Sequence, residues 1–331
     1  MGYYCKWFFR IIKCKERICL VKYMKKRMLE IGDISGTLCC GVVILNYNSH
    51  NLTVTLAEKL ANYKSIDKIC VVDNCSKDEF SGEFNHHKIH YIKNSKNLGY
   101  SAGNNVGLKY LINECNCEFV FIANPDVEFD DNTICQMCNQ MQKEDGLAII
   151  ATKRYGYRGE KIHQYFDFPT FRVSIKNCFA IIRKNFRRDR HITQNNEIDN
   201  SKEVFYVDAV PGAFFGMRSS FLLKNNFLYE GIFLYGEEII LGRQARNLGY
   251  KVGIINTGEY YHNHIQKRFS ESNRKMFWYD RCSLIKYYQL FRLLKWYQMI
   301  ALKIAILLGT LEYNCMYLFY TTVKHFRQSI G

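Results

Sequence analysis

Polar side chains gather at four points where the sequence predicts that a buried strand ends. These clusters are Asn46-Tyr47-Asn48, Asp73-Asn74, Asn97 to Asn105, and Asn124-Pro125-Asp126. A single Asp at such a point is often a turn former or a helix cap. Four clusters at successive strand ends favour a ligand site, because buried strands do not point carboxylates at a shared edge without a partner.

The fourth cluster follows the clearest strand signal in the chain. Residues 119–123, FVFIA, form an unbroken apolar run, as in a strand buried on both faces. Pro125 has no N–H for a neighbouring strand, so it ends the ladder and stiffens the exit from the sheet. Asp126 is therefore predicted to stand at the edge of the sheet.

Strands and helices alternate through the first half of the chain. Apolar runs predict strands at 41–47, 68–73, 89–94 and 119–124, and helical spacing predicts helices at 51–63, from the Gly/Asn-rich segment 97–107 to about 113, and at 131–143. This alternation indicates an α/β fold of parallel βαβ units, with a mostly parallel sheet flanked by helices. Ligands of such sheets bind at the carboxyl ends of the strands, where the four clusters lie.

The second half of the chain is less regular. Residues 152–202 are predicted to be irregular, with a basic stretch at 183–191 that is either a substrate-facing excursion or a solvated loop. Beyond them the sequence predicts strands at 203–210, 212–217 and 251–256, and a helix at 237–250.

Both ends of the chain have features of membrane-associated segments. Residues 1–35 are basic and aromatic, which suits an amphipathic helix on an anionic membrane or a solvated basic helix docked on the body. The tail is predicted to be helical over 274–293 and 296–323. Lys303 and Glu312 interrupt the second of these segments, so we expect a monotopic or docked helix there and no spanning helix.

The overall charge narrows the range of partners. The chain has 331 residues and a formal charge of +15, which favours nucleic acid, anionic lipid or a phosphorylated substrate. No zinc-finger, RRM or other nucleic-acid motif is present, so we expect no nucleic-acid partner.

Cysteine usage indicates a reducing compartment. No secretory signal is recognisable at the basic N-terminus, so the 14 cysteines are expected to be reduced thiols in cytosol. Cys135 and Cys138, with Cys115 and Cys117 upstream, have spacing that suits zinc, although plain helix-face spacing explains them as well.

Familiar nucleotide motifs are missing from the sequence. Ser101 stands where a G-x-G-x-x-G motif would have its second Gly, and neither G-K-[ST] nor H-E-x-x-H occurs. A dehydrogenase or a kinase therefore has little support.

Six ordered segments resemble family 2 glycosyltransferases, most closely the bacterial rhamnosyltransferase-like branch that builds cell-surface polysaccharides. They are VVILNYN (42–48), VVDNCSKD (71–78), NLGYSAGNNVGL (97–108), ANPDV (123–127), VPGAFFGMRSSF (210–221) and FLYGEEIILGRQARNLGYKV (233–252). The resemblance covers roughly 40–285 and implies a GT-A fold with inverting transfer from a nucleotide sugar.

The resemblance implies where a donor would bind. Tyr47 would stack on or flank the base, and Asp73 would accept hydrogen bonds from the base or ribose. Glycine in the donor loop would permit close approach of the backbone. The full set implied for donor binding is Asn46, Tyr47, Asn48, Asp73, Asn97, Gly99, Gly103, Asn104 and Asn124.

The same resemblance implies a cation, Mg²⁺ or Mn²⁺. Asn124 and Asp126 occupy the place of the metal-binding D-x-D, and Asp126 would hold the cation against the diphosphate. His262 lies where the family often places a His near the metal, and His264 is its neighbour.

Glu237 and Glu238 match the place of the catalytic base. Glu238 corresponds to the residue that removes the acceptor proton, although Glu237 remains an alternative, and both could simply stabilise a helix N-terminus. The sequence departs from the family in having Glu at 238 and Ile240, where Asp is usual at each. Gly212 and Arg243 are implied on the acceptor side, and Arg246 on a phosphate or a surface ion pair.

Together these features predict a metal-dependent inverting glycosyltransferase. Its donor would be dTDP-rhamnose or a UDP-hexose, and its acceptor a polyprenyl-diphosphate-linked sugar or a polysaccharide. The predicted parts are a basic segment 1–37, a GT-A domain 38–265 and a helical tail 266–331, with the protein cytoplasmic and peripheral on the inner face of the cell membrane.

Two other functions remain open from the sequence. One is a sugar nucleotidyltransferase, although Asn46-Tyr47-Asn48 replaces the Gly-rich loop that such enzymes usually carry. The other is an inactive membrane-associated scaffold that binds nucleotide sugars, which the departures at 238 and 240 favour.

Overall fold

The computed structural model describes residues 39–78, 84–179, 198–263 and 271–330. The predictions for the basic segment 1–37, for the stretch 183–191 and for His264 therefore lie outside the described residues. In chain order the elements are β1 (Cys40–Asn46), α2 (His50–Ala61), β2 (Lys68–Asp73), β3 (Ile89–Lys93), α3 (Tyr100–Asn113), β4 (Phe119–Ala123), β5 (Val127–Glu128), α4 (Asp131–Lys143), β6 (Leu147–Gly156), α5 (Phe171–Cys178), β7 (Val204–Val207), β8 (Phe214–Arg218), α7 (Ser219–Asn225), α8 (Glu237–Asn247), β9 (Lys251–His262), α9 (Glu271–Leu290) and α10 (Trp296–Ile330).

The strands of the described residues form one sheet, in the order β3-β2-β1-β4-β8-β6-β9-β5, with β7 also paired to β9. Strands β3, β2, β1 and β4 run parallel, as predicted. Antiparallel pairings begin at β8, which separates β4 from β6, while β6 and β9 are again parallel. Because Asn46 is in register with Asp73 and Ile44 with Ala123, the carboxyl ends of β1, β2 and β4 meet at one edge.

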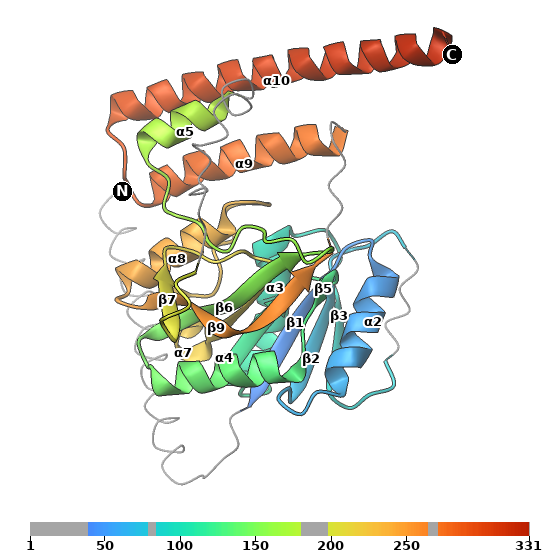
Figure 1. Ribbon diagram of the computed structural model, residues 1–331, viewed down its shortest axis with the longest axis vertical. Helices are drawn as coiled ribbons and strands as arrows, with labels where there is room; N and C mark the ends of the chain where they lie inside the picture. Colours follow the sequence, from blue (N-terminus) through green and yellow to red (C-terminus); the bar gives the residue numbers. More distant parts are fainter. Residues whose placement is uncertain (1–38, 79–83, 180–197, 264–270, 331) are drawn as a thin grey trace, which may run out of the picture. The chain divides into compact units, whose positions relative to one another are not determined.

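Helices cover both faces of the sheet (Figure 1). Alternation along β1 shows why: Val42 and Ile44 enter one core with α2 and α4, whereas Val43 enters a second core with α3 and α8. Because side chains on both faces of β1 are buried, its sequence is apolar from Cys40 to Leu45. It therefore shows no alternation of apolar and polar residues. The predicted α/β sheet flanked by helices is confirmed.

A separate helical layer is formed by α5, α9 and α10 (Figure 1). Its own apolar core includes Tyr287 and Tyr288 of α9 with Leu302 and Ile306 of α10. Gly309 lies so close to α5 that a Cβ there would be 2.0 Å from the Cys178 carbonyl oxygen. One side of α10 is therefore occupied by protein.

The structure corrects three expectations. Residues 152–202 are not irregular throughout, since β6 extends to Gly156 and α5 forms a helix within them. The Gly/Asn-rich segment is mostly helix itself, because α3 begins at Tyr100. The expectation that no run is suited to span a membrane is also wrong: Trp296–Thr322 is long and apolar enough by length and composition, a test that core helices of soluble proteins also pass. The two charged residues in this run, Lys303 and Glu312, are too few to exclude a spanning helix.

Candidate active site

A cleft of about 460 Å³ opens at the carboxyl ends of β1 and β4. Among the predicted residues, Tyr47, Asn124 and Asp126 line it. Ser49, Tyr100 and Asn263 complete its polar side, with Leu45, Leu52 and Pro125 also in its wall. The cleft therefore lies where a parallel sheet is expected to bind its ligand.

Asn46 and Asp73 lie beneath this cleft, fully buried. The Asn46 amide donates to Asp73 Oδ1 at 3.0 Å, and its oxygen accepts from Thr53 Oγ1 at 2.8 Å. Asp73 Oδ1 also accepts the Ser76 N–H at 3.2 Å, while Asp73 Oδ2 is buried without a hydrogen-bond partner among the described residues. Both side chains hold the strand ends together. Contact between Asp73 and a nucleotide sugar stays a prediction.

The loop after β1 is held from the neighbouring strand end. Asn48, in a left-handed conformation, receives the Lys77 N–H on its side-chain oxygen at 2.7 Å, and its own N–H donates to Ser76 Oγ at 2.9 Å. Tyr47 remains 45% exposed at the mouth of the cleft, so its ring is accessible to a base.

The residues of the Gly/Asn-rich segment pack behind the cleft. Asn97 accepts from the Asn74 amide and from the Gly99 N–H, both at 2.9 Å. A Cβ at Gly99, whose φ is +82°, would lie 2.4 Å from the Phe233 carbonyl oxygen, and one at Gly103 would lie 2.8 Å from the Leu45 side chain. Buried Asn104 donates to the Tyr100 carbonyl at 3.0 Å. These residues position Tyr100 at the start of α3.

Tyr100 connects the cleft to the glutamate pair. It lines the cleft and also a small cavity of about 10 Å³ that Gly212, Glu237 and Glu238 share. Its hydroxyl donates to the Gly212 carbonyl, and the Gly212 N–H donates to Glu238 Oε1 at 3.3 Å. Tyr100 was not predicted to be a site residue, because only the fold brings it next to Gly212, 112 residues away.

Glu237 and Glu238 occupy the first turn of α8, after Gly236 at φ +82°. Burial raises the pKa of Glu238, against the opposing effects of hydrogen bonds from its own N–H and from that of Gly212. Burial and the charge of Glu238 raise the pKa of Glu237 well above its ordinary value. Glu237 Oε2 is buried and accepts no hydrogen bond from the described residues. Carboxylates with raised pKa values at a cleft are suited to proton transfer.

Asp126 lies beside His262 at the other end of the cleft. Pairing of β5 with β9 sets Val127 opposite His262, and His262 Nε2 is 3.3 Å from Asp126 Oδ1. Arg154 of β6, absent from the sequence-based site, places Nη2 2.6 Å from His262 Nδ1. An Asp–His–Arg series therefore runs from Asp126 in the wall of the cleft to Arg154 of β6.

A divalent cation fits Asp126. Mg²⁺ and Mn²⁺ prefer oxygen ligands and are commonly held by one or two carboxylates together with substrate phosphates, and the Asp126 carboxylate lines a cleft large enough for a diphosphate. Within the described ranges, no group of three or more His, Cys, Asp or Glu is arranged to hold a metal. The zinc alternative at Cys115, Cys117, Cys135 and Cys138 thus has no structural support.

Arg243 is engaged by the helical tail. Its guanidinium lies 3.8 Å from the centre of the Phe168 ring and hydrogen bonds to Tyr287 Oη of α9 at 2.8 and 3.1 Å. Arg246 pairs with Asp208. An acceptor contact of Arg243 stays a prediction, whereas its tie between α8 and α9 is observed.

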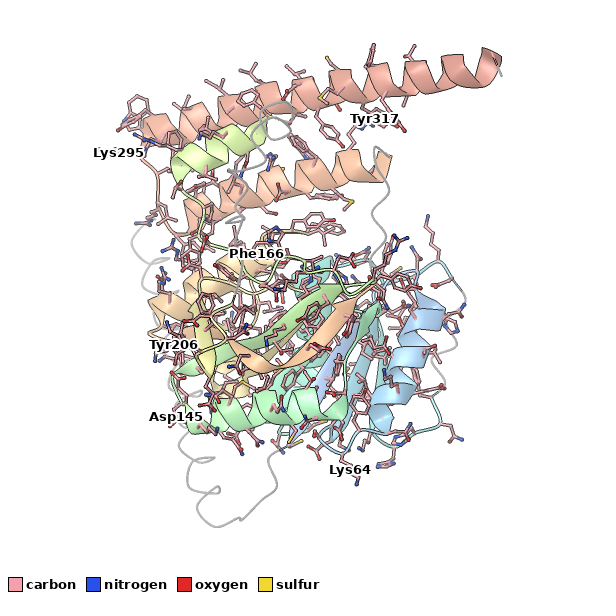
Figure 2. All side chains as sticks on the ribbon, in the orientation of Figure 1. Lys64, Asp145, Phe166, Tyr206, Lys295 and Tyr317 are labelled. Carbon is pink, nitrogen blue, oxygen red and sulfur yellow. The ribbon has the colours of Figure 1, made fainter. Side chains whose placement is uncertain are left out.

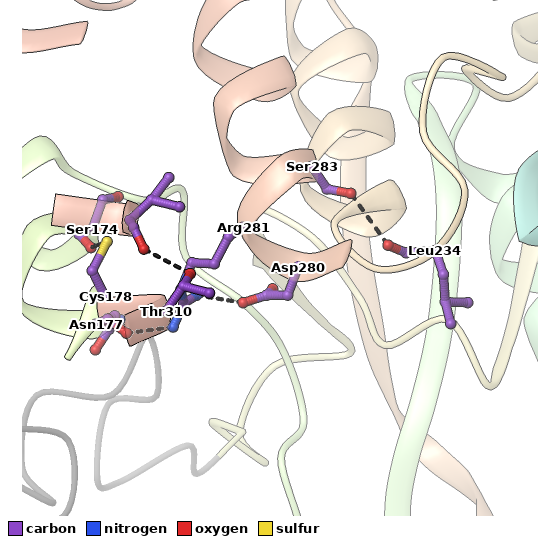
Figure 3. A network of polar contacts seen from close by, with 9 residues as sticks. Ser174, Asn177, Cys178, Leu234, Asp280, Arg281, Ser283 and Thr310 are labelled. Atoms are coloured by element: carbon purple, nitrogen blue, oxygen red, sulfur yellow. Dashed lines mark hydrogen bonds and ion pairs between the residues drawn. The ribbon is translucent and has the colours of Figure 1, made fainter. Parts of the chain in front are cut away.

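The loop before the glutamate pair is also tied to α9 (Figure 3). Ser283 Oγ donates to the Leu234 carbonyl at 3.2 Å, and the Phe233 and Tyr279 rings lie 5.1 Å apart. Buried Arg281, next along α9, contacts Asp280 and the Asn177 carbonyl of α5. Helix α9 therefore holds in place the loop that leads into Glu237 and Glu238.

Comparison with known proteins identifies a family for this chain. Residues 41–220 match the model of glycosyl transferase family 2. A curated relative, the low-salt glycan biosynthesis hexosyltransferase Agl10 of Haloferax volcanii, is 25% identical over 233 residues, which is 70% of each chain.

Solved structures support the fold alone. The mannosyltransferase PcManGT of Pyrobaculum calidifontis, in complex with GDP-Man and Mn²⁺, is 10% identical, with a TM-score of 0.52 over 89% of this chain and 81% of that one. GalNAc-T7 with UDP, GalNAc and Mn²⁺ is 13% identical, with a TM-score of 0.51 over 70% of this chain and 44% of that one. Since the family model covers more than half of the chain, with the glutamates just beyond it, the protein belongs to glycosyl transferase family 2.

Proposed function

We propose that this protein is a metal-dependent, inverting glycosyltransferase with Glu238 as its base. The observation that carries this proposal is the link through Tyr100, which joins the Asp126 cleft to a carboxylate of raised pKa. Gly212 accepts from Tyr100 and donates to Glu238, so the base is oriented by the same residues that shape the cleft.

The reaction follows from these positions. The acceptor hydroxyl gives its proton to Glu238 as its oxygen bonds to the anomeric carbon of the donor sugar. The bond from that carbon to the diphosphate oxygen breaks, and its electron pair leaves with the nucleoside diphosphate. Asp126 would hold a divalent cation, which would supply charge stabilisation for the departing diphosphate. The charge of Glu238 raises the pKa of Glu237, so the pair resists carrying two charges at once.

For the donor we favour a UDP-hexose over dTDP-rhamnose, because the curated relative is named a hexosyltransferase. Tyr47 would lie against the base, and the Asp126 end would face the diphosphate. The acceptor we propose is a lipid-linked sugar of a growing glycan.

The test is a panel of nucleotide sugars in Mn²⁺, read first as thermal stabilisation of the full chain and then as release of nucleoside diphosphate with an acceptor. A ligand that prefers the folded protein raises its melting temperature. One donor is expected to stabilise the protein and to require Mn²⁺. Release of pyrophosphate in place of nucleoside diphosphate would favour the nucleotidyltransferase, and binding without turnover of any acceptor would favour the scaffold.

We also propose that the protein is peripheral on a membrane through α10. Side chains stand out from this helix on the side away from α5 and α9 (Figure 2). Four large apolar residues of α10, Ile300, Ile304, Leu307 and Leu311, are each about half exposed. They recur at helical spacing, which is typical of a helix lying in a membrane interface. Because the opposite side packs on α5, contact along one face is favoured over a span.

Vesicle flotation tests this attachment. The chain is expected to float with anionic vesicles, and Ile304→Asp with Leu307→Asp is expected to abolish flotation. An exposed position on the α2 helix, Leu52→Asp, serves as the control. Resistance of the bound protein to alkaline carbonate would indicate a spanning helix, and loss of flotation in the control alone would remove α10 from the proposal.

A further inference from the structure

Arg154 makes a contact that restricts the chemistry of His262. Arg154 Nη2 lies 2.6 Å from His262 Nδ1. An arginine side chain has five N–H donors, no acceptor and a permanent charge. In this hydrogen bond the guanidinium must donate, so Nδ1 must supply a lone pair.

This contact determines which ring nitrogen carries the hydrogen. A neutral imidazole with its lone pair on Nδ1 carries its hydrogen on Nε2. Nε2 is the nitrogen that faces Asp126, 3.3 Å from Oδ1. A metal-binding nitrogen needs its lone pair, and a ligating histidine typically donates its other N–H to a carboxylate or carbonyl. Arg154 offers the opposite partner, so the arrangement disfavours His262 Nε2 as a ligand.

The backbone of Arg154 is itself firmly held. Its N–H donates to Gln164 Oε1 at 2.8 Å, and its carbonyl accepts from Gln164 Nε2 at 2.6 Å. Gln164 is buried, and Arg154 is in register with Tyr260 of β9, two residues before His262. A second guanidinium nitrogen donates to the His163 carbonyl at 3.4 Å. The contact is therefore built by β6, β9 and the segment at 163–164.

We propose that Arg154 is a positioning residue that fixes His262 in its Nε2–H form, so that the ring supports Asp126 and does not ligate the metal. Asp126 would then remain the protein's carboxylate ligand, and the diphosphate of the substrate would supply further oxygen ligands, as is common for Mg²⁺. The statement about the metal rests on the proposed function, whereas the hydrogen position does not.

The test is a two-bond ¹H–¹⁵N correlation spectrum of the full chain labelled on histidine, at about pH 8, where ordinary imidazoles are neutral. The His262 signals are assigned by their loss in His262→Gln. In the wild type, Nδ1 is expected to show the shift of an unprotonated nitrogen and Nε2 that of a protonated one. Arg154→Met is expected to move the two shifts toward each other, whereas exposed Arg158→Met leaves them unchanged.

Three results would overturn the inference. The first is a wild-type ring protonated on Nδ1, and the second is an unchanged pattern of shifts in folded Arg154→Met. The third is conversion of the His262 ring to the Nδ1–H form when Mg²⁺ and pyrophosphate are added at concentrations that shift the Asp126 amide signal. The wild-type spectrum alone decides if Arg154→Met does not fold. Because no readout uses transfer, the inference can fail while the proposed function stands, and the reverse also holds.

Discussion

The two ends of the site, the cleft at the strand ends and the glutamate pair at the start of α8, solve different physical problems. At the end of β1 and β2, buried Asn46 accepts and donates hydrogen bonds and Asp73 Oδ1 accepts two, although Asp73 Oδ2 has no hydrogen-bond partner among the described residues. At the start of α8, Glu237 Oε2 is buried with no hydrogen bond from the described residues, and both glutamates have raised pKa values. The first arrangement gives a rigid edge for recognition. The second keeps a carboxylate poorly solvated, which costs stability and makes it a better proton acceptor at neutral pH.

Glu238→Gln separates these two ends most strongly. The amide keeps the size of the side chain but cannot take the acceptor proton, so kcat is expected to fall roughly 10²- to 10⁴-fold with little change in donor affinity. Steady-state transfer and donor titration measure the two effects, with exposed Glu114→Gln as the control. Unchanged sugar transfer by Glu238→Gln would show that another residue is the base.

Asp126→Asn is expected to act at the opposite end. Loss of the charged ligand should weaken Mn²⁺ binding in the presence of nucleoside diphosphate on the order of 100-fold, since even outer-shell changes cost about 10-fold or more. Water-proton relaxation measures the bound Mn²⁺. Fully exposed Asp145→Asn is the matched control, and equal Mn²⁺ affinity in both variants would remove Asp126 from the metal site.

Much of the edge can be predicted from the sequence, because it depends on local signals. The predicted strand at 68–73 and helix at 131–143 coincide with β2 and α4, and the other early strands agree within a residue or two. Asp126 was predicted at the edge of the sheet because Pro125 closely follows a wholly apolar run.

Contacts between distant segments could not be predicted in the same way. Tyr100 meets Gly212 across 112 residues, and Arg154 meets His262 across 108. Both depend on how β8 and β9 enter the sheet, which no local pattern encodes. Strand β6 was missed because Lys153 and Arg154 end its apolar run early, and α5 because its eight residues are stabilised by packing on α10.

Tyr100→Phe tests the link between the two ends. Removing one hydroxyl leaves the Gly212 carbonyl without this donor and loosens the loop that orients Glu238, so kcat is expected to fall about 10-fold. The affinity for the nucleotide sugar is expected to change little. Steady-state kinetics check both values, and a loss confined to donor affinity would show that Tyr100 serves only the cleft.

Glu237→Gln is expected to have the smallest effect, and it acts on stability. The folded-state pKa is raised, so the wild type is most stable, relative to the variant, below the unfolded pKa near 4.5 and loses that stability as pH rises toward the folded pKa. The variant should therefore melt a few degrees above the wild type at pH 8 and show a smaller advantage at pH 4.5. Calorimetry measures both, and a constant difference across pH would contradict the burial of this carboxylate.

The pH dependence of kcat in the wild type tests the central claim most directly. A buried glutamate acting as base must be ionised, so the rate is expected to fall as pH drops through an apparent pKa clearly above 4.5, shared by the coupled pair. The residual rate of Glu238→Gln should lack that limb. A wild-type rate that stays level down to pH 4.5, or a limb that persists unchanged in Glu238→Gln, would contradict the account.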